Sequence, residues 1–85
     1  MSQTGTMRYW AAAKEAAGCA EEPYSAMTLG AALAAAAAAH DERFAAVLRR
    51  CSFIVDGNPV GSRAHDEVVL SAAGVVEVLP PFAGG

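Results

Sequence analysis

Residues 75–85 read Val75-Val76-Glu77-Val78-Leu79-Pro80-Pro81-Phe82-Ala83-Gly84-Gly85. The first five are almost all β-branched or aliphatic, which is typical of a strand covered on both faces by the rest of the fold. The two prolines that follow have no backbone N–H, so ladder pairing cannot continue beyond Leu79. We therefore expect a single domain over residues 1–79 and an extended tail over residues 80–85.

The first part of the chain has the pattern of a strand followed by a short helix. Residues 6–10 (Thr-Met-Arg-Tyr-Trp) favour an extended strand, and the alanine-rich segment 11–17 favours a helix. Gly18 is well suited to the left-handed conformation that ends helices. Residues 21–23 (Glu-Glu-Pro) indicate a turn or an edge strand, because proline cannot donate into a sheet ladder.

One long main helix is predicted to begin after Thr28, a good N-cap residue, and to run through Leu48. Apolar side chains recur at helical spacing through a run of six alanines, and they should cover the sheet: Leu29, Leu33, Phe44, Val47 and Leu48. Five charged residues should stay in solvent: Asp41, Glu42, Arg43, Arg49 and Arg50. We expect His40 on the latter half of this helix, near a favourable helix dipole or on a solvated surface.

The second half of the chain favours strands and turns. Residues 52–55 and 58–60 should pair around Asp56-Gly57, a dipeptide that supplies the positive φ of tight turns. A polar loop over residues 61–67 precedes a short strand or helical turn at 68–70. One long helix against a mixed sheet makes a two-layer α+β domain, in which the first and last strands are expected to be central neighbours.

The composition excludes several classes of function. The chain has 85 residues, six basic and nine acidic, and 21 of its apolar residues are alanine, so its core should be small. The basic residues form no stripe, which argues against nucleic acid as a partner. No stretch is apolar enough for a membrane span, and two widely separated cysteines fit a reducing, cytoplasmic setting.

Other groups of reactive side chains give weak signals. Cys19, His40, Cys51 and His65 lack the close spacing of metal-binding pairs, so no metal site is expected. Asp66 and Glu67 are adjacent and would point to opposite faces of a strand, which suits solvated residues better than paired acid and base catalysis.

The tail offers a different kind of chemistry. Gly84 and Gly85 lack Cβ atoms, so this backbone can enter a channel too narrow for other residues and present its carboxylate there. A carboxylate becomes a useful electrophile only after activation, for instance by adenylation with ATP. The sequence contains no glycine-rich phosphate cradle, so we expect it to bind no cofactor and a partner to use the ATP.

The chain resembles the MoaD/ThiS family of ubiquitin-like sulfur carriers. The resembling stretches are residues 8–18, Thr28-Leu29, Phe53-Ile54-Val55-Asp56-Gly57 and, above all, residues 76–85. Leu79-Pro80-Pro81 followed by Gly84-Gly85 is similar to MoaD, the small subunit of molybdopterin synthase, more than to ThiS. The resemblance implies a β-grasp (ubiquitin-like) fold, with a mixed sheet packed on one main helix.

The resemblance also implies the roles of the tail residues. Gly85, with Gly84 before it, would be adenylated by a ubiquitin-activating-like adenylyltransferase and converted to a thiocarboxylate. It would then give up sulfur to precursor Z inside the large subunit of molybdopterin synthase. The partner-binding residues would be Pro80, Pro81, Phe82 and Ala83. By this interpretation the chain is a protein co-substrate and not an enzyme.

Two alternatives and one departure from the family pattern stay open. The chain could be a ubiquitin-like conjugation or interaction module, or a sulfur carrier for thiamine or cysteine synthesis. The family usually has an acidic Asp-Gly-Asp turn before the last strand, where this chain has Ala72-Ala73-Gly74. The sheet face opposite the helix is either a docking patch that works together with Phe82 or a polar surface carrying residues such as Arg8 and Glu77.

Overall fold

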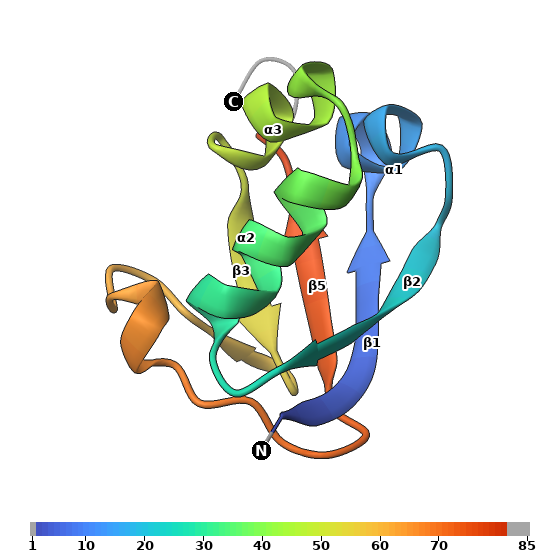
Figure 1. The fold of residues 1–85 in the computed structure, drawn as a ribbon. Helices are drawn as coiled ribbons and strands as arrows, with labels where there is room; N and C mark the ends of the chain where they lie inside the picture. The colour runs from blue at the N-terminus through green and yellow to red at the C-terminus, as the bar shows by residue number, and fades with distance from the viewer. Residues whose placement is uncertain (1, 82–85) are drawn as a thin grey trace.

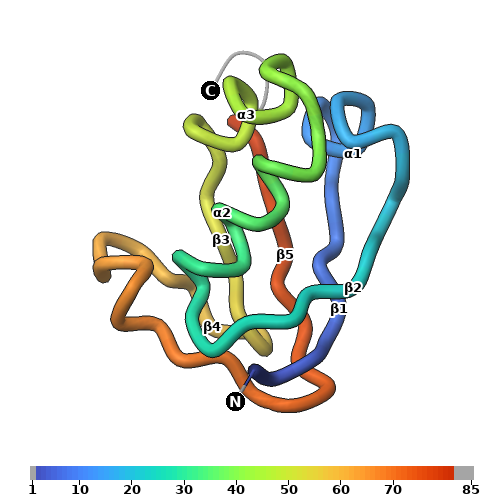
Figure 2. The backbone as a smooth tube through the Cα atoms, viewed as in Figure 1, coloured from blue at the N-terminus to red at the C-terminus, as the bar shows by residue number. Residues whose placement is uncertain are grey.

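The computed structural model of the chain describes residues 2–81, which form one mixed five-stranded sheet with helices on one face (Figures 1 and 2). The sheet order is β2-β1-β5-β3-β4, with β1 parallel to β5 and β3 antiparallel to it. The first and last strands are therefore central neighbours, and the expected α+β class is confirmed. The elements are β1 Gln3–Tyr9, α1 Ala11–Ala17, β2 Glu21–Ala26, α2 Leu29–Ala39, α3 Glu42–Leu48, β3 Ser52–Val55, β4 Asn58–Pro59, the 3-10 helix η1 His65–Glu67 and β5 Val75–Leu79.

The core lies between the helices and the face of the sheet that they cover (Figure 1). Its largest fully buried side chains come from β1, β5, α2, α3 and the loop before β5: Tyr9, Phe44, Met7, Leu29, Leu70, Val76 and Val78. On β5 burial alternates, because Val76 and Val78 face the helices while Val75, Glu77 and Leu79 are only half-buried. The prediction that this strand is covered on both faces is therefore wrong, since helices lie on one side alone.

The predicted single main helix is also wrong, because the chain breaks at His40 and Asp41 into α2 and α3. Thr28 caps α2 as expected, its hydroxyl accepting a hydrogen bond from the Ala31 N–H at 3.2 Å. Asp41 has extended backbone angles and caps α3, its Oδ1 accepting from the Phe44 N–H at 3.0 Å. A second N-cap inside an apparently continuous helical pattern starts a new helix with a different direction.

Other local predictions are confirmed in detail. Gly18 ends α1 with φ 76°, and its N–H donates to the Lys14 carbonyl at 3.0 Å. Pro23 lies in β2, an edge strand of the sheet. Asp56-Gly57 turns between β3 and β4, both with positive φ. The prediction of a short strand or helical turn at residues 68–70 is wrong, because this segment forms only one isolated bridge, between Val69 and Thr28.

Within residues 2–81, none of the helices has the length and apolar character needed to cross a membrane.

Candidate functional site

The base of the tail is fixed to the body of the protein. Pro80 is buried and Pro81 is exposed, so the chain emerges into solvent between these two residues. A cavity of about 110 Å³ lies there, lined by Ala12 of α1, Val47 of α3, Arg50, Pro80 and Pro81. The predicted site residues Phe82, Ala83, Gly84 and Gly85 lie outside the described residues.

The strand that leads into the tail is held from both sides. β5 pairs with β1 through Thr6–Tyr9 and with β3 through Ser52–Val55, so it has no free edge over most of its length. At its far end the Trp10 N–H donates to the Val78 carbonyl at 3.2 Å. A central strand with neighbours on each side is the most rigid support that this small sheet offers for a tail.

The start of β5 is held by Asp56, a role that the sequence did not reveal. Its Oδ1 accepts from the Val75 N–H at 2.8 Å, and its Oδ2 accepts from the Ser71 hydroxyl at 2.7 Å. The Asp56 N–H also donates to the Val75 carbonyl at 2.9 Å. The hydrogen bonds from Ser71 and Val75 lower the pKa of the Asp56 carboxyl below its ordinary value. The Asp-Gly pair was a signal for the turn, but nothing in the sequence indicated which later residues this carboxylate would bind.

Residues 72–74 stand where the family usually has an acidic turn. Their backbone is held by hydrogen bonds to β1, and they carry no acidic side chains. Ala73 has φ 58°, and its N–H donates to the Thr4 carbonyl at 2.7 Å. The Gly74 carbonyl accepts from the Thr6 N–H at 2.9 Å and so begins the pairing of β1 with β5. Asp56 supplies a carboxylate to Ser71 and Val75, which lie on either side of this turn.

The sheet face opposite the helices is mixed in character. Half-buried Ile54, Val75 and Leu79 lie on it, but so do Arg8 and Glu77, which are cross-strand neighbours. Arg8 also lies 3.5 Å from the Glu21 carboxylate, measured from Nε to Oε2, and both side chains are about half exposed. Neither of the two interpretations of this face is favoured by this composition.

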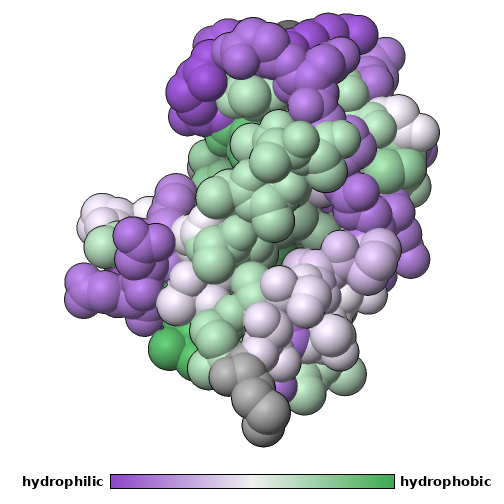
Figure 3. Space-filling view, viewed as in Figure 1, coloured by the Kyte–Doolittle hydropathy of each residue, from purple (hydrophilic) through white to green (hydrophobic). Residues whose placement is uncertain are grey.

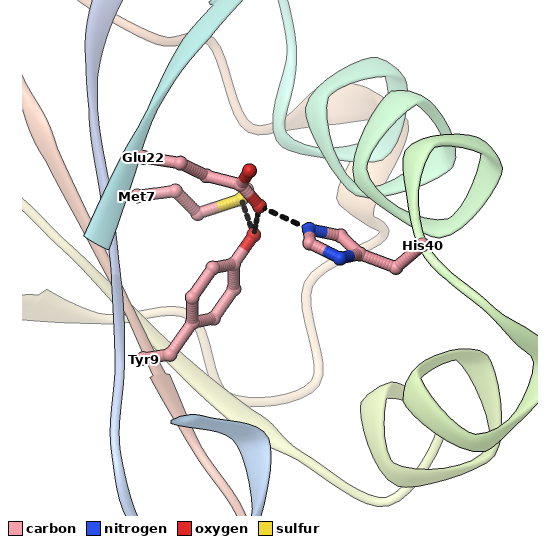
Figure 4. A network of polar contacts seen from close by, with 4 residues as sticks. All are labelled: Met7, Tyr9, Glu22 and His40. Atoms are coloured by element: carbon pink, nitrogen blue, oxygen red, sulfur yellow. Dashed lines mark hydrogen bonds and ion pairs between the residues drawn. The ribbon is translucent and has the colours of Figure 1, made fainter. Parts of the chain in front are cut away.

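His40 is not a solvated helix residue as predicted, because it joins a part-buried polar network (Figure 4). Its Nε2 lies 2.7 Å from the Glu22 Oε2, which also accepts a hydrogen bond from the Tyr9 hydroxyl. Burial, and after it the hydrogen bond and charge of Glu22, raise the pKa of the Tyr9 hydroxyl. No sequence pattern indicates this network, since its members lie on β1, β2 and the break between α2 and α3.

The four residues considered as metal ligands are not assembled into a site. His65 lies edge-on to Phe53, with ring centroids 5.1 Å apart, and the Cys51 thiol donates to the Val47 carbonyl at 3.2 Å. Burial raises the pKa of Cys51 to about 11 and also raises that of Cys19. Both thiols are therefore poor nucleophiles at neutral pH. Among residues 2–81 there is no group of three or more metal-ligating side chains.

Asp66 and Glu67 are exposed as expected, but they lie in η1 and not in a strand. A 3-10 helix places neighbouring side chains roughly a third of a turn apart. These two carboxylates therefore do not converge on a common point.

Comparison with known families matches residues 7–85 to the ThiS family, which covers nearly the whole chain and includes its tail. The chain belongs to the ThiS family. This family comprises ThiS/MoaD-like ubiquitin-like sulfur carriers, so the resemblance noted in the sequence is confirmed. No protein of curated function matches the sequence significantly.

Solved structures confirm the β-grasp fold of this ThiS-family chain. The small archaeal modifier protein SAMP1 of Methanosarcina acetivorans superposes with a TM-score of 0.84 at 18% identity, covering 100% of this chain and 99% of that one. SAMP1 of Haloferax volcanii gives 0.78 at 21% identity, covering 96% and 99%. A Pyrococcus furiosus protein provisionally named molybdopterin converting factor, subunit 1, gives 0.78 at 20% identity, covering 95% and 100%. At these identities the likeness establishes the fold alone.

Proposed function

We propose that this ThiS-family chain is a sulfur carrier for molybdopterin synthesis and that the carboxyl group of Gly85 is its working group. The observation that carries the proposal is the family match, which extends to Gly85. The sequence Leu79-Pro80-Pro81 before Gly84-Gly85 supports the molybdopterin branch in particular. A fold shared with a protein named as a molybdopterin converting factor subunit is consistent with it.

The chemistry begins with activation of the carboxylate by a partner. A Gly85 carboxylate oxygen bonds to the α-phosphorus of ATP, pyrophosphate leaves, and an acyl-adenylate results. The terminal sulfur of a persulfide on the donor then attacks the carbonyl carbon, AMP leaves, and an acyl disulfide forms. A thiol attacks the donor-side sulfur of this disulfide, which releases the thiocarboxylate and leaves the donor sulfur in a disulfide with that thiol. When the sulfur is passed to the acceptor, water supplies the oxygen that restores the carboxylate.

In this proposal the chain is a co-substrate whose partners carry the catalytic groups. One partner is a ubiquitin-activating-like adenylyltransferase, and the other is the large subunit of molybdopterin synthase. Pro80 and Pro81 would set the direction in which the tail leaves, since proline restricts φ and permits few conformations. Phe82 and Ala83 would contact the channel walls, and Gly84 would pass its narrowest part.

A second candidate function is that of a ubiquitin-like modifier. Two of the similar structures are named small archaeal modifier proteins, which favours this alternative specifically. The same acyl-adenylate would then be attacked by an amine, and Gly85 would end in an amide bond to another protein. Both functions share the activation step and differ in the nucleophile that follows it.

The test is the intact mass of the chain after incubation with the activating enzyme of its host, ATP and a sulfur donor. A gain equal to the mass difference between sulfur and oxygen supports carriage, and its absence rejects it. Deletion of Gly85 should abolish the gain without changing thermal unfolding, because chain ends seldom support the core. Deletion of Ser2, at the opposite end, is the control and should change neither.

The pathway is tested with the thiocarboxylated chain. Added to the molybdopterin synthase large subunit, it should transfer sulfur to precursor Z and return to the carboxylate mass. Transfer only in the presence of a thiazole-forming or cysteine-forming enzyme would reject the molybdopterin assignment. Covalent adducts of higher mass on a denaturing gel, without any thiocarboxylate, would favour the modifier.

A further inference from the structure

The charges of the chain are distributed unevenly between its two ends. Four of the six basic residues lie on α1, on α3 or directly after α3, and together we call them the α1–α3 basic surface: Lys14, Arg43, Arg49 and Arg50. Only three of the nine acidic residues lie on α1, on α3 or directly before α3: Glu15, Asp41 and Glu42. Four against three leaves this end at +1 in a chain of net charge −3, so the remainder carries −4.

Three of these four basic residues make no ion pair within the described part of the chain: Lys14, Arg43 and Arg50. Arg49 pairs with Glu42 at 3.1 Å, measured from Nη2 to Oε1. Asp41 is engaged in capping α3. Within residues 2–81, no carboxylate lies within 4.0 Å of a charged nitrogen of Arg43 or Arg50, and both side chains are exposed. The hydrophilic residues gathered over α3 are visible at the top of Figure 3.

One member of the α1–α3 basic surface lies at the base of the tail. Arg50 lines the same cavity of about 110 Å³ as Pro80 and Pro81. Figure 1 places α1 and α3 at the end of the sheet where β5 finishes. A protein that binds the chain at Pro80 and Pro81 therefore comes close to Arg50, to Ala12 of α1 and to Val47 of α3.

We propose that the α1–α3 basic surface, with Arg50 beside the tail, docks against an acidic rim on the enzyme that activates Gly85. This inference rests on the proposed function and adds the chemistry of the partner's surface to it. Exposed cations at the edge of an interface raise the rate of association with an anionic surface and fix its orientation. Arginine is suited to this role because its planar guanidinium can bind a carboxylate through two hydrogen bonds. Only four basic residues interspersed with three acidic ones are too few to track a nucleic acid backbone.

The experiment measures adenylation of the chain by the activating enzyme of its host, as ATP–pyrophosphate exchange at low and high salt. Arg50→Ala should raise KM for the chain by ~3- to 10-fold at low salt with kcat unchanged, and Arg43→Ala combined with it should raise KM further. The difference in KM between these variants and the unsubstituted chain should shrink in ~1 M salt, where charges are screened within ~3 Å.

The matched control is Ala64→Glu, which changes the net charge by the same single unit on an exposed turn next to η1, away from α1 and α3 (Figure 1). It should leave KM unchanged. Urea unfolding of Arg50→Ala should match that of the unsubstituted chain, since Arg50 makes no ion pair with a described residue. A chain with Arg50→Glu should regain the KM of the unsubstituted chain when carboxylates on the enzyme's rim are replaced by lysine.

The outcomes separate the two proposals. If the unsubstituted chain is not adenylated at all, the proposed function fails and its docking surface fails with it. If the chain is adenylated and Arg50→Ala has the same KM as Ala64→Glu at both salt concentrations, only the docking surface is rejected. Loss of binding to anionic vesicles in Arg50→Ala, with KM unchanged, would also reject it and assign the surface to lipid.

Discussion

His40 Nε2 lies 2.7 Å from Glu22 Oε2, and this contact joins the break between α2 and α3 to the edge strand β2. The His40 ring also packs on Phe44, with centroids 4.5 Å apart, at the first turn of α3. The carboxylate is shared with the buried Tyr9 hydroxyl (Figure 4). One polar network and one aromatic cluster therefore help to hold α3 in place, and Val47 of this helix lines the cavity beside Pro80 and Pro81.

His40→Ala should lower the free energy of unfolding by about 1–3 kcal/mol, because it leaves the part-buried Glu22 carboxylate short of a partner. The comparison is Glu42→Ala, which removes one partner of the exposed Glu42–Arg49 pair and should cost under about 1 kcal/mol. Urea unfolding followed by circular dichroism measures both. Equal losses would show that the His40–Glu22 contact is no stronger than a surface ion pair.

Gly5→Ala should destabilise the fold by about 1–3 kcal/mol through overpacking. A Cβ on Gly5 would overlap the ring of Tyr24, which crosses β1 to donate its hydroxyl to the Ser71 carbonyl at 2.8 Å, and the carbonyl oxygen of Gly74. In a Tyr24→Ala background the same substitution should cost less, since contacting residues are energetically coupled. Additive losses in thermal unfolding would contradict this explanation.

Ala73→Gly should stabilise the protein by about 0.5–1 kcal/mol, because Ala73 has φ 58°, a left-handed conformation that glycine adopts without strain. Ala72→Gly is the matched control. Ala72 has no positive φ, so its replacement should lower stability by up to about 1 kcal/mol. Chemical denaturation distinguishes a gain from a loss, and a loss at both positions would be inconsistent with strain at Ala73.

Asp56→Asn should weaken the dependence of stability on acid pH. The pKa of Asp56 is lowered in the folded protein. Its carboxylate therefore stabilises the fold fully at pH values above its ordinary pKa of 3.8. That contribution is lost as the pH falls through the folded value. The free energy of unfolding of the Asn variant should therefore be lower at neutral pH and should change less between about pH 5 and pH 2.

Asp66→Asn serves as the control for this pH series, because Asp66 is exposed and its side chain makes no hydrogen bond to another described residue. Its pH profile should follow that of the unsubstituted chain. A parallel shift of the Asp56→Asn profile, with no change in slope, would mean that the Ser71 and Val75 contacts do not favour the charged carboxylate.

The parts of the fold that follow from short-range patterns were predictable. Gly18, Thr28 and Asp56-Gly57 each act through backbone conformation or a contact within three or four residues, and each lies where the sequence placed it. The break at Asp41 also has a local signal. An aspartate followed by Glu42 and then by apolar residues is typical of a helix start, but the alanine run before it favours a continuous helix.

The contacts of the site depend on which strands become neighbours. Short-range sequence patterns do not indicate that pairing. Asp56 and Val75 are brought together only because β3 and β5 pair, and Arg50 meets Pro81 only because α3 packs at the end of β5. The sequence therefore indicated the chemistry of the tail but not the side chains around its base.

The parallel pairing of β1 with β5 also has a consequence for biosynthesis. Strands β1 and β3 do not pair with each other. Each pairs with β5, which is the last of the five strands to leave the ribosome. A nascent chain without Val75–Leu79 exposes two unpaired inner edges, which are prone to association with other chains. The five-stranded sheet can form only after synthesis has passed Leu79. A translation product that stops before β5 would therefore lack this sheet.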